Sequence, residues 1–325
     1  MRKITLTLDR LIDLRYDKIF KAVFTQETPA SRKALTALLE SCLNRRLDVV
    51  TVIANEPAAQ SEQKRQIRYD IACTFNNGEL ADVEVTLWPK GTEPLRIEYY
   101  LSRLFVSQNL SGIDKDFGDL KQSYQISILG DNLYADSHVA HWFEYYDPER
   151  KISLGGRTAI VTLELNKLEG LVETPPEQMN GKERWGLFLG YASEPGRLGL
   201  VNKLLEVEEG IAMAGEAILQ LPKSQIEEIR RISREKFEVD QRQARHDVER
   251  AKREAEQAKY DLEQVRQEVE QVRQEAEQAR EALKQAKQEQ DAALRENARN
   301  LKKLGIPIDQ IAQGIGLSVE DIEKL

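Results

Sequence analysis

The chain has few of the side chains that hold disulfide-stapled or cysteine-zinc folds together, with two cysteines and three histidines in 325 residues. Cys42 and Cys73 lie far apart in the sequence and neither belongs to a CxxC pair, which excludes a disulfide framework and a cysteine zinc site. We expect both to be reduced, buried thiols of a cytoplasmic protein. His138, His141 and His246 form no catalytic triad with these thiols, so no nucleophilic site of that kind is predicted.

Long apolar runs and an excess of basic charge are also missing. No stretch of about 18 uncharged apolar residues occurs, so we expect no membrane span. Residues 1–18 interrupt every apolar stretch with a charge and show no cleavage site, which argues against a signal peptide. The net charge of −8 excludes a surface coated with basic side chains, and any DNA contact must then come from a local patch.

Charge is instead concentrated in the later part of the chain. Charged residues make up 31% of the sequence, above the roughly 25% of ordinary globular proteins. Between residues 225 and 300, Pro, Gly and aromatic residues nearly vanish, and apolar residues recur at alternating steps of three and four. This period is typical of a coiled coil. We therefore predict an α/β domain over 1–220, a coiled coil over 225–300 and a short helical unit over 301–325.

The charges beside the predicted apolar seam indicate how two such helices would pair. With Val248, Ala255, Leu262 and Val269 at heptad position a, every e position from 245 to 287 is Lys or Arg. The g positions from 247 to 289 are Asp or Glu, apart from Ala282. A parallel homodimer sets e against g and gains attractive pairs, whereas an antiparallel one opposes like charges. We therefore expect a parallel homodimer, with a single solvated helix or docking on another protein as the alternatives.

The short unit after the coiled coil resembles a helix-turn-helix in outline. Two short helices are predicted on either side of Gly314 and Gly316, with Ser318 as the N-cap of the second. That second helix carries Glu320, Asp321 and Glu323 against one lysine, which makes it a poor surface for DNA phosphates. We expect a terminal packing unit rather than a DNA reader.

The first 220 residues show an alternation of helical and strand-like patterns. Helices are predicted at 16–24, 31–43 and 95–109, and strands at 48–53, 66–75, 79–87 and 124–129. The order helix, three strands, helix, strand is typical of an α/β core with a mixed sheet. Two later strands, at 141–146 and 158–165, are expected to extend that sheet.

The hairpin formed by the second and third strands decides which side chains share a face. A three-residue loop with Gly78 in the left-handed conformation pairs Phe75 with Glu79 and places Asp70 directly opposite Glu84. The same parity puts Ile71, Cys73 and Phe75, together with Tyr69, on an apolar face. A two-residue turn would shift the register by one and mix apolar with acidic positions, so we reject it.

Two carboxylates opposite each other on a sheet repel when both are ionised. A hard divalent ion such as Mg²⁺ relieves that repulsion and can present a bound water to a phosphodiester. Asp70 and Glu84 are therefore candidate metal ligands, with Asp82 on the same face as a substitute ligand. The alternative is that this polar face is simply solvated.

The order of elements, with Asp70 on the second strand and Glu84 on the third, resembles the PD-(D/E)XK nuclease core. Further residues resemble the Rpn family of recombination-promoting nucleases and transposases over about residues 10–220. The matching positions are Asp17, Phe20, Lys21, 99–104, Gln108, Gly112, 116–121, 124–128, 163–165 and Lys167. The fold expected from this resemblance is a PD-(D/E)XK-like mixed-sheet core (αβββαβ) followed by a long C-terminal coiled coil.

The resemblance implies a metal-dependent DNA endonuclease in which Asp70 and Glu84 hold one or two Mg²⁺ ions (or Mn²⁺ or Ca²⁺). The third motif position departs from the pattern, because Thr86 stands where the superfamily has Lys and the Rpn branch commonly Gln. A threonine hydroxyl can bind a water but carries no charge to activate it. Lys90 or Lys21 could supply the missing cation. The alternative function is a catalytically impaired DNA-binding or assembly protein on the same fold.

A basic patch leads into the Asp70 strand. Lys64, Arg65 and Arg68 are the best local candidates for contacts with the DNA backbone, with Arg96 and Arg103 as a possible extension. The alternative is that these basic residues simply precede a strand and contact no DNA. Gln108, on the helix after the third strand, is a further candidate for a contact with the site.

Overall fold

The structure, a computed structural model, describes residues 3–48, 50–53, 69–76, 78–110 and 115–325. It divides into two compact units, Met1–Glu238 and Val239–Leu325. No helix in the described ranges is both long enough and apolar enough to cross a bilayer. Lys64, Arg65 and Arg68, the predicted DNA-contacting patch, lie outside the described residues.

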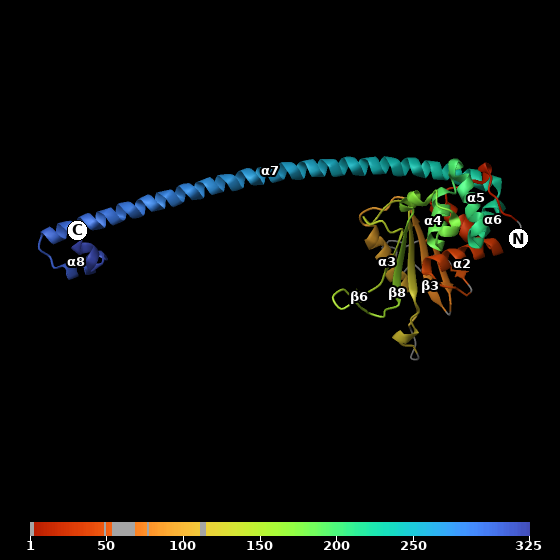
Figure 1. Cartoon of the computed structure of the whole chain (residues 1–325), viewed down its shortest axis with the longest axis horizontal. Helices are drawn as coiled ribbons and strands as arrows, with labels where there is room; N and C mark the ends of the chain where they lie inside the picture. Colours follow the sequence, from red (N-terminus) through yellow and green to blue (C-terminus); the bar gives the residue numbers. More distant parts are fainter. Residues whose placement is uncertain (1–2, 49, 54–68, 77, 111–114) are drawn as a thin grey trace, which may run out of the picture. The chain divides into compact units, whose positions relative to one another are not determined.

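The first unit is built around a mixed β-sheet (Figure 1). Six described strands pair in the order β1-β2-β3-β4-β8-β5. The strands are β1 (Thr51–Val52), β2 (Ile71–Phe75), β3 (Glu79–Thr86), β4 (Ser123–Leu129), β8 (Thr158–Glu164) and β5 (Ala140–Phe143). The pairs β3–β4 and β4–β8 are parallel, and the others are antiparallel. The predicted mixed α/β sheet is confirmed.

Helices cover both faces of this sheet. One face is packed by α1 (Asp17–Phe24), α2 (Pro29–Leu43), α4 (Gly181–Tyr191), α5 (Leu198–Val207) and α6 (Glu209–Gln220). Strand residues such as Ile71, Val83, Ile126 and Val161 share one buried apolar cluster with them. The other face is covered by α3 (Glu93–Val106), which packs on β3, β4 and β8 (Figure 1). Short 3₁₀ helices lie at Leu8–Arg10, Phe117–Asp119, Leu165–Leu171, Pro176–Gln178 and Pro195–Arg197.

The β2–β3 hairpin has the predicted register. Phe75 pairs with Glu79 and Ile71 with Val83, and Gly78 has a φ of +96°, in the left-handed region that favours glycine. The prediction for Tyr69 was wrong: its ring lies under α3 with Ala72, Leu80 and Leu104 rather than with Ile71. The reason is a bend at Asp70, which precedes β2 and interrupts the strict alternation of faces.

One predicted strand is shorter than expected. The sheet strand β5 ends at Phe143, and Tyr146 belongs to a separate ribbon of β6 (Tyr146–Asp147) and β7 (Ile152–Ser153). The Asp147 carboxylate accepts hydrogen bonds from the backbone N–H groups of Glu149 and Arg150, and this turn reverses the chain directly after Tyr146.

The second unit contains most of one long helix, α7 (Lys223–Lys303), which spans 81 residues. It is followed by α8 (Ile308–Ile315) and α9 (Val319–Glu323). Ala298, Ile311 and Ile322 form a small buried cluster that joins these two short helices to the end of α7. Along α7, the larger apolar residues of the heptad seam, among them Val248 and Leu262, are more than half exposed in the single chain.

Candidate active site

Two acidic side chains, one just before β2 and one on β3, are linked through hydrogen bonds to the main chain of the β2–β3 hairpin. Asp70 precedes β2 and Glu84 lies on β3, and both are buried, with 6% and 3% of their surface exposed. The backbone N–H of Asp70 donates to Oε1 of Glu84 at 2.8 Å, and the backbone N–H of Val85 donates to Oδ2 of Asp70 at 3.1 Å. The alternative of a simply solvated polar face is therefore wrong, because α3 covers it.

Each of the two carboxylates also contacts a cation. Nζ of Lys21, from α1, lies 3.0 Å from Oδ1 of Asp70, and a guanidinium nitrogen of Arg96, from α3, lies 2.5 Å from Oε2 of Glu84. Lys21 is also within 3.7 Å of Asp17, one turn earlier on the same helix. Two acidic groups from the sheet are thus balanced by basic groups from helices on its two faces.

Burial and mutual repulsion change the protonation of this cluster. Loss of solvent, and then the charge of Asp70, raise the pKa of Glu84 to about 8, although Arg96 and Lys21 act in the opposite direction. Burial and the charge of Glu84 also raise the pKa of Asp82 well above its usual value. For Lys21, burial is the largest single effect and would lower the pKa, but the charge and hydrogen bond of Asp70, together with the charges of Asp17 and Glu84, outweigh it and the pKa is raised.

Comparison with protein-family models gives a match over residues 14–248, to the PD-(D/E)XK nuclease family transposases. The chain belongs to this family. Comparisons with curated proteins and with solved structures found no match. Membership of the PD-(D/E)XK nuclease family implies hydrolytic chemistry on nucleic acid, and the matched residues include both buried carboxylates and the helices that carry Lys21 and Arg96.

Thr86, which the sequence analysis assigned to the third motif position, contacts a cation from another element. The Thr86 hydroxyl donates to Oε1 of Glu93 at 2.9 Å and accepts from a guanidinium nitrogen of Arg96 at 2.9 Å. Arg96 therefore contacts Thr86 and Glu84 together. The sequence analysis placed Arg96 only in a phosphate patch. Arg96 lies three residues after Glu93 and four before Tyr100 on α3, and this spacing, which places the three side chains on one side of a helix, was the available signal.

The acidic face continues to Asp82, which is fully buried. Neither of its carboxylate oxygens makes a well-formed hydrogen bond within the described part of the chain, and the same holds for the side-chain amide of Gln125, its neighbour on β4. Ser127, opposite Glu84 on β4, likewise has a buried hydroxyl without a partner among those residues. Such groups are costly to bury and are typical of sites that hold water or an ion.

The structure does not bring every candidate residue to this cluster. Lys90 has an exposed side chain in the turn between β3 and α3, where its carbonyl accepts from the backbone N–H of Glu93. Gln108 lies at the far end of α3, where it donates to the carbonyl of Lys121 and to the Ser123 hydroxyl and accepts from the backbone N–H of Lys121. Gln108 thus ties α3 to the start of β4 instead of contacting the carboxylates.

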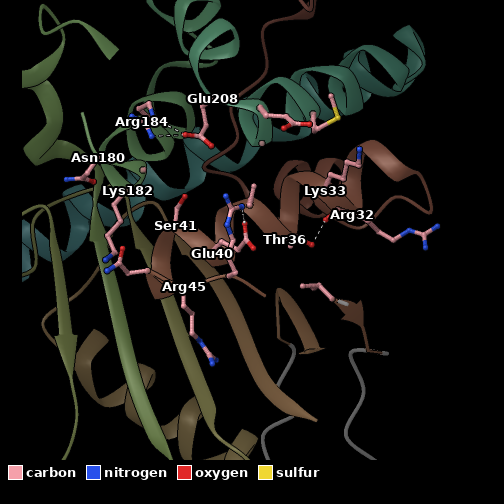
Figure 2. A pocket seen from close by; sticks show the side chains of 18 of the residues that line it. Arg32, Lys33, Thr36, Glu40, Ser41, Arg45, Asn180, Lys182, Arg184 and Glu208 are labelled. Carbon is pink, nitrogen blue, oxygen red and sulfur yellow. Dashed lines mark hydrogen bonds and ion pairs between the residues drawn. The ribbon is translucent and has the colours of Figure 1, made fainter. Parts of the chain in front are cut away.

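A large open cavity lies on the other side of the sheet. It has a volume of about 1040 Å³ and is lined by residues of α2, α4 and the start of α6. Lys33 and Lys182 line it from α2 and α4, while Arg184 is paired with Glu208 at 2.9 Å (Figure 2). Asp70 and Glu84 are not among its lining residues, so the cavity is separate from the carboxylate cluster.

Proposed function

We propose that the chain is a metal-dependent DNA endonuclease of the Rpn type, which hydrolyses phosphodiester bonds at Asp70 and Glu84. The observation that carries the proposal is that each of these two buried acidic side chains accepts a hydrogen bond from the main chain beside the other, and we assign the pair to the motif positions of the PD-(D/E)XK family to which the chain belongs. Structural acidic residues are rarely buried side by side, because the second charge raises the cost of burying the first. Such an arrangement is typical of a functional site.

The donor set suits a hard divalent cation. Asp70, Glu84 and Asp82 offer only carboxylate oxygens, and both oxygens of the buried Asp82 lack a well-formed hydrogen bond within the described residues. Oxygen donors of this kind favour Mg²⁺, with Mn²⁺ or Ca²⁺ as alternatives. Asp70 and Glu84 would hold the ion, with Asp82 behind them. When bound, it supplies a Lewis acid that polarises the phosphate and makes a bound water more acidic.

The basic groups of the cluster have two roles in this proposal. Lys21 and Arg96 balance Asp70 and Glu84 within the chain, at 3.0 and 2.5 Å. Once an ion takes over that balance, the same side chains are placed to bind the non-bridging phosphate oxygens, whose charge grows during hydrolysis. Arg96 then supplies the charge that Thr86 lacks, and the contacts favour Lys21 over Lys90 as the second cation. Lys64, Arg65 and Arg68 would add contacts to the DNA backbone.

We further propose that two chains pair through a parallel coiled coil over residues 225–300, between the nuclease domain (1–220) and the short unit (301–325). The support is the heptad seam on α7, whose Val265 and Val269 are 53% and 62% exposed in the single chain. Pairing covers that surface. Two cutting centres in one dimer could then act on both strands of a duplex. We place the protein in the cytoplasm, because both cysteines are free, buried thiols.

The test is nicking of supercoiled plasmid DNA in Mg²⁺ or Mn²⁺ by the full chain. We expect D70N and E84Q to reduce the rate by at least about 100-fold. Glu79 lies on β3, as Glu84 does, but it pairs with Arg45 away from the cluster. E79Q is therefore the matched control and should retain the nicking rate. Equal background cleavage by all four proteins would contradict the proposal and favour a catalytically impaired DNA-binding or assembly protein.

A further inference from the structure

Asp136, His138 and His141 form a second group of side chains of the types that bind metals, at the β5 edge of the sheet. Asp136 and His138 lie on the loop between β4 and β5, and His141 lies on β5. One carboxylate oxygen or imidazole nitrogen from each lies within 4.8 Å of the others. Nε2 of His141 is 2.9 Å from Oδ2 of Asp136, and Nδ1 of His138 is 3.2 Å from Oδ1 of the same carboxylate.

The His141 imidazole is held in place by its surroundings. Its Nδ1 lies 3.4 Å from the hydroxyl of Thr162, which is fully buried on β8. The rings of Tyr134 and Phe143 pack beside it, with centroids 4.7 and 5.9 Å away. Only 17% of the His141 side chain is exposed. The Thr162 hydroxyl can donate to or accept from Nδ1, so it orients the ring in either tautomer and leaves Nε2 aimed at Asp136, as outer partners do for metal-bound histidines.

We propose that Asp136, His138 and His141 bind one zinc-class divalent transition-metal ion, with water in the remaining coordination position. Ligands about 2.0–2.1 Å from a tetrahedral zinc ion lie roughly 3.3 Å apart. Oδ1 of Asp136 lies 3.1 Å from Nε2 of His141 and 3.2 Å from Nδ1 of His138, close to that spacing. Two imidazoles with one carboxylate favour Zn²⁺ and similar ions over Mg²⁺, which prefers oxygen ligands only. The site joins the β4–β5 loop to the edge strand β5.

The ammonium group of Lys167 does not occupy the position proposed for the metal ion. Nζ of Lys167 lies 3.6 Å from Oδ1 of Asp136, but the same ammonium is ion-paired with the buried Glu164 and donates to the carbonyl of His138 at 3.0 Å. Lys167 is thus held on the Glu164 side of Asp136. The competing explanation is a metal-free triad, in which protonated imidazoles bind the Asp136 carboxylate directly.

The zinc-class site and the carboxylate cluster lie at the two ends of one row across the sheet. Glu84 on β3 is paired with Ser127 on β4, Ser127 with Thr162 on β8, and Thr162 with His141 on β5. Three strand spacings of about 4.8 Å separate the ends by about 14 Å. The two centres therefore share no ligand, and the donor types differ, so the ions they select should differ as well.

The test is titration of the metal-free full chain with Zn²⁺ by calorimetry, and with Co²⁺ by visible absorption, which reports tetrahedral nitrogen and oxygen ligands. We expect one equivalent to bind, and H138A and H141A each to weaken its affinity by at least about 100-fold. His246, on α7, is the remaining histidine, so H246A is the matched control and should bind like the unchanged chain. His138 is 78% exposed, so H138A removes a ligand without disturbing the packing of the loop.

Binding is also measured in the D70N/E84Q double variant, so that this site is distinguished from the carboxylate cluster. Retention of the Zn²⁺ equivalent there, with loss in H138A, supports the proposal whether or not the chain cuts DNA. Absence of Zn²⁺ binding by the unchanged chain, or equal affinity in H138A and H246A, overturns it and favours the metal-free triad.

Discussion

The backbone N–H of Asp70 donates a hydrogen bond to Oε1 of Glu84 at 2.8 Å, across the start of the β2–β3 hairpin. The N–H of Val85 returns one to Asp70, so the two carboxylates are fixed in position by the main chain and not only by their side-chain partners. Because the main-chain hydrogen bonds can be kept by an amide oxygen, we expect D70N and E84Q to retain the fold while each loses an ion pair, with Lys21 or with Arg96. Amide variants therefore separate the loss of charge from the loss of fold.

Stability should depend on pH through Glu84. Its pKa is raised to about 8 in the folded chain, above the ordinary 4.5, so the folded state holds a proton that the unfolded state has released. This group therefore destabilises the fold progressively as the pH rises above 4.5, and its effect levels off above about 8. Between pH 6 and pH 8 the free energy of unfolding should fall by on the order of 1–2 kcal/mol from this source.

Urea denaturation at the two pH values measures this effect. Tryptophan fluorescence reports the first unit alone, because Trp88, Trp142 and Trp185 all lie there. E84Q should remove the part of the difference that comes from Glu84, leaving any part from Asp82, whose pKa is also raised, whereas E79Q should keep the whole difference. Mg²⁺ should stabilise the unchanged chain more at pH 8 than at pH 6, since it competes with the proton. An unchanged pH dependence in E84Q would contradict the assignment.

Replacing the two candidate lysines should have unequal effects on cleavage. Lys21 lies 3.0 Å from Asp70, whereas Lys90 is exposed in the turn after β3. We expect K21M to lower the plasmid-nicking rate by roughly 10–100-fold, because a positive charge next to the reacting phosphate is lost. K90M should stay within about threefold of the unchanged chain. A larger loss in K90M than in K21M would show that Lys90 supplies the missing charge instead.

The orientation of the coiled coil can be tested by a disulfide. In a parallel, in-register dimer, position a of one helix faces position a of its partner, so L262C should give a covalent dimer under mild oxidation. Tyr260 is equally exposed but lies at the outer position f, so Y260C is the control and should remain monomeric on a non-reducing gel. The native thiols add little background, because burial raises the pKa of Cys42 to about 12 and raises that of Cys73 too. Cross-linking of Y260C but not L262C would contradict the parallel seam.

The sequence was sufficient to predict the hairpin and its register. Alternation of apolar and acidic residues around Gly78 allowed one pairing that kept each face uniform, and the structure has that pairing. The same reasoning misplaced Tyr69, since alternation predicts faces only while the strand stays straight. The bend at Asp70 depends on its contacts with Glu84 and Val85, which are distant in sequence.

The environment of the carboxylates could not be predicted in the same way. The apolar spacing of residues 95–109 predicts a helix with one buried side, but it does not say which face of the sheet receives it. Once α3 lies over the acidic face, Arg96 pairs with Glu84 and Thr86, because a buried carboxylate such as that of Glu84 is costly to leave without a partner. The grouping of Asp136, His138 and His141 depends in the same way on the path of a loop and on the pairing of β5 with β8.

The pairing of Asp70 with Lys21 and of Glu84 with Arg96 has a consequence for the life of the protein in the cell. A nascent chain that carries its own counter-charges can complete its fold during synthesis, whatever the local supply of magnesium. Under the proposed function, scarcity of the ion would leave an intact but inactive molecule rather than a misfolded one for proteases to remove. A rise in free ion after the protein has accumulated would then switch on the proposed cleavage of DNA.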